Sequence, residues 1–147
     1  MDYKLLCAQL KALTEDVENE ISNLSNASAL LWQELSDINW AGFYKMEGGI
    51  LVLYPFQGKP ACTKISVGKG VCGTAVAENR TQLVPDVHQF PGHIACDCAS
   101  NSEIVVPMYK NGQLFGVLDI DSPQFDRFSE TDRQGLEQFA RILEVYL

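Results

Sequence analysis

Two strand-like runs near the C-terminus constrain the fold more than any other feature of the sequence. Residues 103–109 and 113–121 are rich in β-branched and aliphatic side chains, and Asn111-Gly112 lies between them. An Asn-Gly pair between two such runs is a strong hairpin signal, because both residues tolerate a positive φ angle. We therefore expect an antiparallel β-hairpin in the C-terminal half of the chain.

Shorter signals for strands and helices surround this hairpin. Apolar residues at helical spacing run through 6–17 and 21–35, and Ser129 is placed to cap a last helix whose first turn is acidic. Strands are expected over residues 39–46, 50–54, 65–67 and 82–84, and a short helix from Gly70 that ends at Asn79. Alternation along the first of these strands places Trp40 and Tyr44 on one face and Ala41 and Phe43 on the other. The order of these elements predicts one α+β domain over residues 1–147, with a mainly antiparallel sheet covered by helices.

Composition narrows the classes of function. The 147 residues carry a formal net charge of -8, which repels phosphate backbones and argues against nucleic-acid binding. No apolar run approaches the roughly 20 residues of a membrane span, and the first residues lack the pattern of a signal peptide. We expect a cytoplasmic protein that binds neither membranes nor nucleic acids.

The second strand of the hairpin carries two acidic residues in register. Strand alternation places Phe115, Val117, Asp119 and Asp121 on one face, so the two aspartates project from the same side about 7 Å apart. Because they continue an apolar row, we expect them at the edge of the core.

Glu103 is expected to join these aspartates. If the turn contains Lys110 as well as Asn111-Gly112, Glu103 lies opposite Asp119; a two-residue turn would send Glu103 to the other face, and we favour the longer turn. Like charges opposed across a sheet are destabilising. The cluster then requires a bound cation, a ligand ammonium or a protonated carboxyl.

The sequence holds five cysteines, Cys7, Cys62, Cys72, Cys96 and Cys98. The odd number and the absence of a signal peptide argue against a permanent disulfide framework. Cys7 lies in an apolar helical pattern and is expected only to pack. Cys72 follows Lys69 at an expected helix N-terminus, a position that favours a thiolate.

Two uses of the remaining cysteines stay open on residue chemistry alone. His93, Cys96 and Cys98, together with Cys62 or Cys72, could hold zinc, although the spacing is not a usual ligand pattern. Alternatively, one thiolate attacks an electrophile, a second thiol resolves the product to a disulfide, and nearby carboxyls handle protons.

Long contiguous motifs extend over nearly the whole chain: SNLSNASA (22–29), NWAGFY (39–44), PFQGKPAC (55–62), GKGVCGTA (68–75), DVH (86–88), GHIACD (92–97), SNSEIV (100–105) and GVLDIDS (116–122). In these motifs the chain resembles the free methionine-R-sulfoxide reductase family of GAF-domain proteins. The resemblance implies a six-stranded antiparallel sheet flanked by helices, a homodimer, and reduction of free methionine-R-sulfoxide without a bound cofactor or metal.

The resemblance also implies a role for each cysteine of the redox hypothesis. Cys96 matches the nucleophile that attacks the sulfoxide sulfur, Cys62 the first choice to resolve its sulfenic acid, and Cys72 a second resolving partner. The resulting disulfide would be reduced by thioredoxin, an external protein. Cys98 stands where the family is expected to have a small residue without a thiol; it is either a spare resolving thiol or only a small side chain, and we favour the second.

The same resemblance assigns a substrate pocket. Glu103, Asp119 and Asp121 match the family's carboxylates, and Trp40 and Tyr44 match its aromatic wall. We expect His88 and His93 to have structural roles, and Tyr54, where the family has Gly, to leave the chemistry untouched. The rival hypothesis is a GAF module that senses a small molecule without turnover, since one fold hosts unrelated functions.

Overall fold

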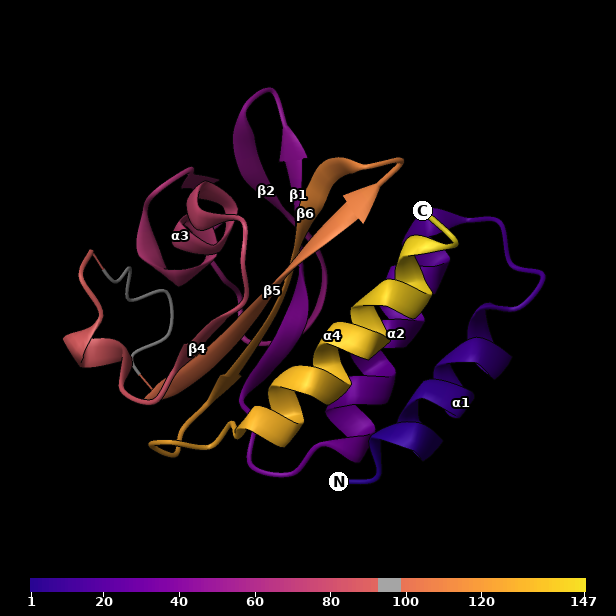
Figure 1. The fold of residues 1–147 in the computed structure, drawn as a ribbon, viewed down its shortest axis with the longest axis horizontal. Coiled ribbons are helices and arrows are strands. Elements are labelled where there is room, and N and C mark those ends of the chain that lie inside the picture. The colour runs from indigo at the N-terminus through magenta and orange to yellow at the C-terminus, as the bar shows by residue number, and fades with distance from the viewer. Residues whose placement is uncertain (93–98) are drawn as a thin grey trace.

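In the computed structural model, residues 1–92 and 99–147 are described, and they form one six-stranded antiparallel sheet with helices on both faces (Figure 1). The strand order is β3-β2-β1-β6-β5-β4. The strands are β1 (Trp40–Glu47), β2 (Ile50–Gly58), β3 (Lys64–Ser66), β4 (Gln82–Val84), β5 (Ser102–Lys110) and β6 (Gln113–Ser122). The helices are α1 (Tyr3–Thr14), α2 (Glu20–Glu34), α3 (Gly70–Glu78), α4 (Glu130–Glu144) and the short 3-10 helix η1 (Val87–Gln89). The predicted α+β class with an antiparallel sheet is confirmed.

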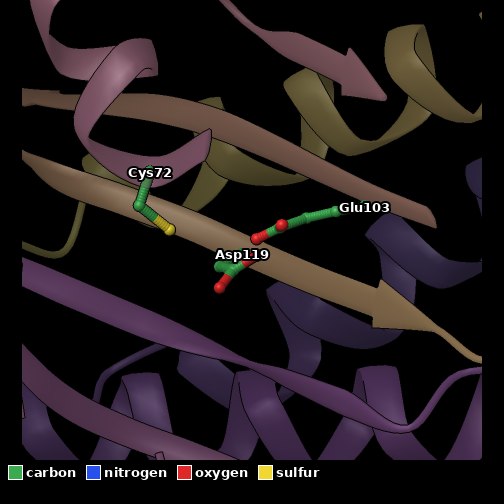
Figure 2. A group of neighbouring side chains, drawn as sticks. All are labelled: Cys72, Glu103 and Asp119. Carbon is green, nitrogen blue, oxygen red and sulfur yellow. The ribbon is translucent and has the colours of Figure 1, made fainter. Parts of the chain in front are cut away.

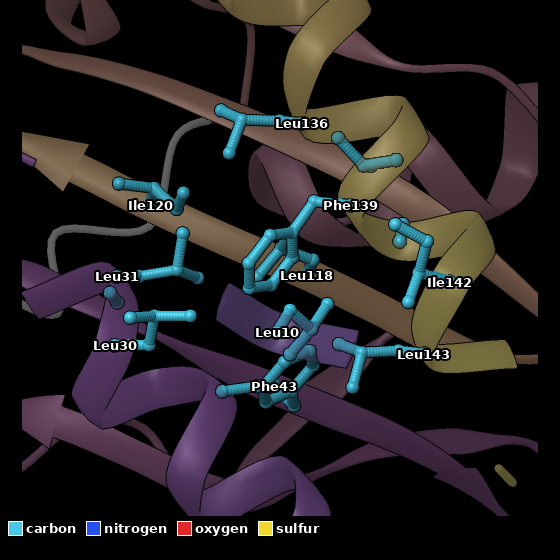
Figure 3. Close-up of a cluster of buried hydrophobic side chains, with 14 of the residues drawn as sticks. Leu10, Leu30, Leu31, Phe43, Leu118, Ile120, Leu136, Phe139, Ile142 and Leu143 are labelled. Carbon is cyan, nitrogen blue, oxygen red and sulfur yellow. The ribbon is translucent and has the colours of Figure 1, made fainter. Parts of the chain in front are cut away.

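The larger core lies between one face of the sheet and helices α1, α2 and α4. Figure 3 shows Phe43 and Leu118 from the sheet meeting Leu10, Phe139 and Leu143 from the helices. None of the described helices has both the length and the apolar character that a bilayer span requires.

Polar side chains cap three of the four α-helices. Asp2, Asn19 and Ser129 each accept a hydrogen bond from the backbone of the first turn, which satisfies an otherwise unpaired N–H group. At α4, Ser129 and Asp132 form a reciprocal capping box, so the predicted start of the last helix is confirmed. The first helix is shorter than expected: it ends at Thr14, so Val17 lies beyond it.

The opposite face of the sheet carries a smaller core under α3. Trp40 and Tyr44 lie on this face, whereas Ala41 and Phe43 lie in the larger core, as strand alternation predicted. Cys72 of α3 belongs to the same small core.

The β5–β6 hairpin differs from the predicted register. Its turn is the two-residue Asn111-Gly112, with φ angles of 54° and 77°, and Lys110 pairs with Gln113. The predicted three-residue turn is therefore wrong.

A β-bulge compensates for the shorter turn. Tyr109 pairs with Leu114 but Met108 pairs with Gly116, which leaves Phe115 as the extra residue. Phe115 therefore faces the larger core and not the row of the aspartates, contrary to expectation. Beyond the bulge Glu103 pairs with Asp121, so the three acids share one face as predicted, although for a different reason.

Candidate active site

A cavity of about 50 Å³ lies between α3 and the sheet. Strand β1 supplies Trp40 and Tyr44 to its wall, and α3 supplies Cys72. Glu103 on β5 and both aspartates on β6, Asp119 and Asp121, line the same space. The structure thus brings together all five substrate-pocket residues predicted from the sequence, together with one of the predicted cysteines.

The acidic cluster of this cavity is largely buried. Glu103 and Asp119 are only 8% and 5% exposed, and Asp121 is half-buried. Figure 2 shows the side chains of Cys72, Glu103 and Asp119 converging, and one ligand atom from each lies within 4.8 Å of the others. Antiparallel pairing produces this convergence, because it sets Glu103 directly beside Asp121 and Val105 beside Asp119.

Burial raises the pKa of two of these acids, Glu103 and Asp119, and so favours their protonated forms. Loss of solvation, followed by the negative charges of Asp119 and Asp121, raises the pKa of Glu103 well above that of an ordinary glutamate. Burial also raises the pKa of Asp119, although hydrogen bonding with Glu103 and Cys72 acts in the opposite direction. The cluster can therefore donate a proton at a pH where a carboxyl group in water could not.

Cys72 does not have the activated thiol expected from its place in the sequence. Burial, then the charges of Asp119 and Glu103, raise the pKa of this thiol well above its ordinary value. A helix N-terminus contributes only about 0.3–1 kcal/mol to a nearby anion. Because desolvation and the acids outweigh that effect, the prediction that Cys72 is held as a thiolate is wrong.

The aromatic wall also holds the loop that carries Cys62. Trp40 stacks on Tyr44 and on Phe56, with ring centroids 5.9 Å and 5.1 Å apart. The Trp40 indole N–H donates to the carbonyl of Lys59 at 3.2 Å, and the Tyr44 hydroxyl donates to the carbonyl of Cys62 at 2.9 Å.

Sequence reasoning missed Phe56, which does not line the cavity but supports its wall by stacking on Trp40. It lies against Gly42, where an added Cβ would be 2.2 Å from the Cβ of Phe56. The signal available in the sequence was its place in the motif that precedes Cys62, within PFQGKPAC (55–62).

The cysteines are in different states. Cys62 is disulfide-bonded, whereas Cys7 and Cys72 are free thiols. Cys7 packs in the larger core, as predicted. Cys96 and Cys98 lie within residues 93–98, outside the described residues, so the roles expected for them stay predictions.

Of the two histidines, only His88 lies within the described residues. The His88 ring nitrogen Nε2 is 2.8 Å from the Asn101 side-chain oxygen, and Asp86 accepts from the His88 backbone N–H. These contacts tie η1 to the start of β5, which fits the structural role expected of His88. His93 lies outside the described residues.

Comparisons of the sequence and of the structure with known proteins identify relatives of this chain. The GAF domain family matches residues 22–147. The free methionine-R-sulfoxide reductase of Escherichia coli is 55% identical over 145 residues, which cover 99% of this chain and 88% of that protein. The structure of fRMsr of Staphylococcus aureus in its reduced form superposes with a TM-score of 0.97 at 56% identity, covering 99% of this chain and 95% of that one. The structure of the same Staphylococcus aureus protein in complex with substrate superposes with a TM-score of 0.95 at 55% identity, again covering 99% of this chain and 95% of that one.

Proposed function

The chain belongs to the free methionine-R-sulfoxide reductase family of GAF-domain proteins, and from this premise we propose that it reduces free methionine-R-sulfoxide to methionine. One observation carries the proposal: three acidic side chains and two stacked aromatic rings line a single cavity, and those rings hydrogen-bond the loop that bears Cys62.

The cavity offers a partner for each part of the substrate. The acidic cluster of Glu103, Asp119 and Asp121 can bind the substrate ammonium or donate a proton to the sulfoxide oxygen. The apolar faces of Trp40 and Tyr44 suit the S-methyl group. Backbone N–H groups of the surrounding loops can donate hydrogen bonds to the substrate carboxylate, as they do to other anions.

The proposed chemistry moves two electrons from thiols to the sulfoxide. The Cys96 thiolate attacks the sulfoxide sulfur, and the oxygen takes a proton from the acidic cluster. Methionine leaves as the oxygen passes to Cys96, which becomes a sulfenic acid. The Cys62 thiol then attacks that sulfenic sulfur, a disulfide forms and water is released. Thioredoxin, through its own dithiol, returns the pair to the reduced state.

The described residues support Cys62 in this role. Its loop is held against the cavity by the hydrogen bonds from Trp40 and Tyr44, and its sulfur is disulfide-bonded while Cys72 is free. Cys72 is therefore proposed as the second resolving thiol. We also propose that the enzyme acts as a homodimer in the cytoplasm.

The decisive test is a coupled assay with free methionine-R-sulfoxide, thioredoxin, thioredoxin reductase and NADPH. We expect NADPH oxidation with the R epimer and much less with the S epimer. Cys96→Ser should abolish turnover, whereas Cys62→Ser should release about one methionine per chain and then stop. Full activity in Cys96→Ser would refute the mechanism, and binding of the sulfoxide without turnover by the native protein would favour the sensor hypothesis.

A further inference from the structure

We propose that Cys72, Glu103 and Asp119 bind a thiophilic divalent cation such as Zn²⁺, and that the bound cation closes the cavity to methionine sulfoxide. The cation site is a property of these three side chains alone. Only its inhibitory consequence rests on the proposed function.

The geometry of the three side chains suits a small cation. Zinc binds oxygen at about 2.0 Å and sulfur at about 2.3 Å, so tetrahedral ligand atoms lie roughly 3.3–3.7 Å apart. One atom from each of Cys72, Glu103 and Asp119 already lies within 4.8 Å of the other two, and Figure 2 shows all three side chains pointing toward one another. Small side-chain rotations would close the remaining distance, because all three side chains line the same cavity.

A buried oxygen in this cluster needs a partner. Asp119 is 5% exposed, and its Oδ1 atom has no hydrogen-bond partner among the described residues. An unsatisfied buried acceptor costs about 1–3 kcal/mol, and more when it is charged. A cation at the centre of the cluster would supply the missing interaction.

The balance of charge around the cavity favours a cation over an anion. Glu103, Asp119 and Asp121 line it, and Lys69 is the one basic side chain among the described lining residues. The mixed set of one thiol and two carboxyl oxygens is of the type that zinc accepts, with a water or Asp121 available for a fourth position. A cavity of about 50 Å³ accommodates an ion with a water beside it.

This site differs from the zinc set considered from sequence alone. That set used His93, Cys96 and Cys98, completed by Cys62 or Cys72. The two hypotheses therefore predict opposite responses to substitution. Zinc binding at the present site requires Cys72 and Asp119 and does not depend on Cys98.

Cobalt(II) titration tests the site without any assay of turnover. The protein is first freed of metal and reduced with a phosphine, since a dithiol would itself bind metal. We expect a thiolate-to-cobalt charge-transfer band that is lost in Cys72→Ser, and zinc affinity, measured against a chromophoric chelator, that falls at least tenfold in Asp119→Asn. Cys7→Ser, Cys62→Ser, Cys98→Ser and the exposed Glu47→Gln should retain the band, and circular dichroism should verify that each variant is folded.

Two outcomes would overturn the cation site: no band in the native protein, or a band that persists in Cys72→Ser but is lost in Cys98→Ser or His93→Ala. Methionine sulfoxide added to the cobalt-loaded protein should diminish the band in proportion to its concentration. A band that sulfoxide does not diminish would refute the blocking of the cavity. Absence of reductase activity together with an intact cobalt band would refute the proposed function and leave the cation site standing.

Discussion

Glu103 places a carboxyl group in a setting where ionisation is costly. Its side chain is 8% exposed and faces Asp121 across the β5–β6 pair, with Asp119 close by. Deprotonation of Glu103 or Asp119 therefore adds a charge that is largely shielded from solvent and lies beside other acidic groups. The same property that suits Glu103 to donate a proton makes it a source of pH-dependent instability.

We predict that Glu103→Gln reduces the loss of stability with rising pH. Because the pKa of Glu103 is raised in the folded protein, that protein binds more protons than the unfolded chain above about pH 4.3, so stability falls as pH rises toward the folded pKa. Glutamine keeps the shape and cannot ionise. The difference between variant and native protein should grow by at most about 1.4 kcal/mol per pH unit.

Urea unfolding of both proteins between pH 5 and pH 8 measures this difference, taking about 1.4 kcal/mol per pH unit as its ceiling. The exposed Glu47→Gln provides the matched control and should follow the native curve. Parallel pH curves for the native protein and Glu103→Gln would contradict the account of the acidic cluster.

Tyr44 contributes a ring to the cavity and a hydroxyl to the loop of Cys62. We predict that Tyr44→Phe leaves the affinity for sulfoxide nearly unchanged, because the ring that stacks on Trp40 is kept. The lost hydrogen bond to the Cys62 carbonyl is worth roughly 1 kcal/mol, so disulfide formation should slow about fivefold.

Rapid-quench measurement of methionine release and of thiol loss separates these steps. Methionine release in the first turnover should keep its native rate while thiol loss slows. Tyr54→Phe is the control, since that hydroxyl donates to Glu20 at the start of α2 and not to the loop of Cys62. An equal slowing in both variants would show that Tyr44 has no special role toward Cys62.

At the scale of elements, the bulge in β6 decides where the acids point. It lies two paired positions beyond the two-residue turn, and it shifts the register so that Glu103 lies on the same face as the aspartates. Without the bulge, the two-residue turn would place Glu103 on the opposite face. Gly116, next to Phe115, lies so close to β1 that an added Cβ would be 2.0 Å from the Tyr44 carbonyl oxygen. A glycine is therefore required where the bulged strand meets its neighbour.

We predict that Gly116→Ala lowers the free energy of unfolding by more than about 2 kcal/mol, because backbone on β1 must move to admit the methyl group. Gly112→Ala in the same hairpin is the matched control. It meets no atom within 4 Å and suffers only from its positive φ angle, which costs about 1–2 kcal/mol. Denaturant unfolding gives the loss of unfolding free energy for each variant. A smaller loss in Gly116→Ala than in Gly112→Ala would refute the close approach of Gly116 to the backbone of β1.

At the scale of the whole molecule, the sheet separates the larger apolar core, which lies on one face, from the cavity, which lies on the other. Helices α1, α2 and α4 cover the face that holds the larger apolar core, while α3 and its neighbouring loops cover the face that holds the cavity (Figure 1). The cavity wall draws on β1, α3 and the β5–β6 hairpin, which are three separate parts of the chain. Polar and acidic groups can therefore gather on one face because the opposite face supplies most of the apolar burial.

The sequence by itself determined the features that depend on near neighbours in the chain. Strand alternation fixed the faces of Trp40 and Tyr44, Asn111-Gly112 fixed the hairpin, and Ser129 fixed the start of α4. Each rests on local backbone geometry or on a hydrogen bond within one turn, which is why residue pattern alone predicts it.

Only the tertiary structure decided the features that depend on distant partners. The bulge at Phe115 forms where β6 pairs with both β1 and β5, and no local residue pattern predicted it. The raised pKa of Cys72 depends on burial under the folded chain and on acids that β5 and β6 bring to the N-terminus of α3. Phe56 of β2 supports the aromatic wall by stacking on Trp40 of β1. Desolvation and packing act between segments remote in sequence, so their outcome is set when the chain has folded.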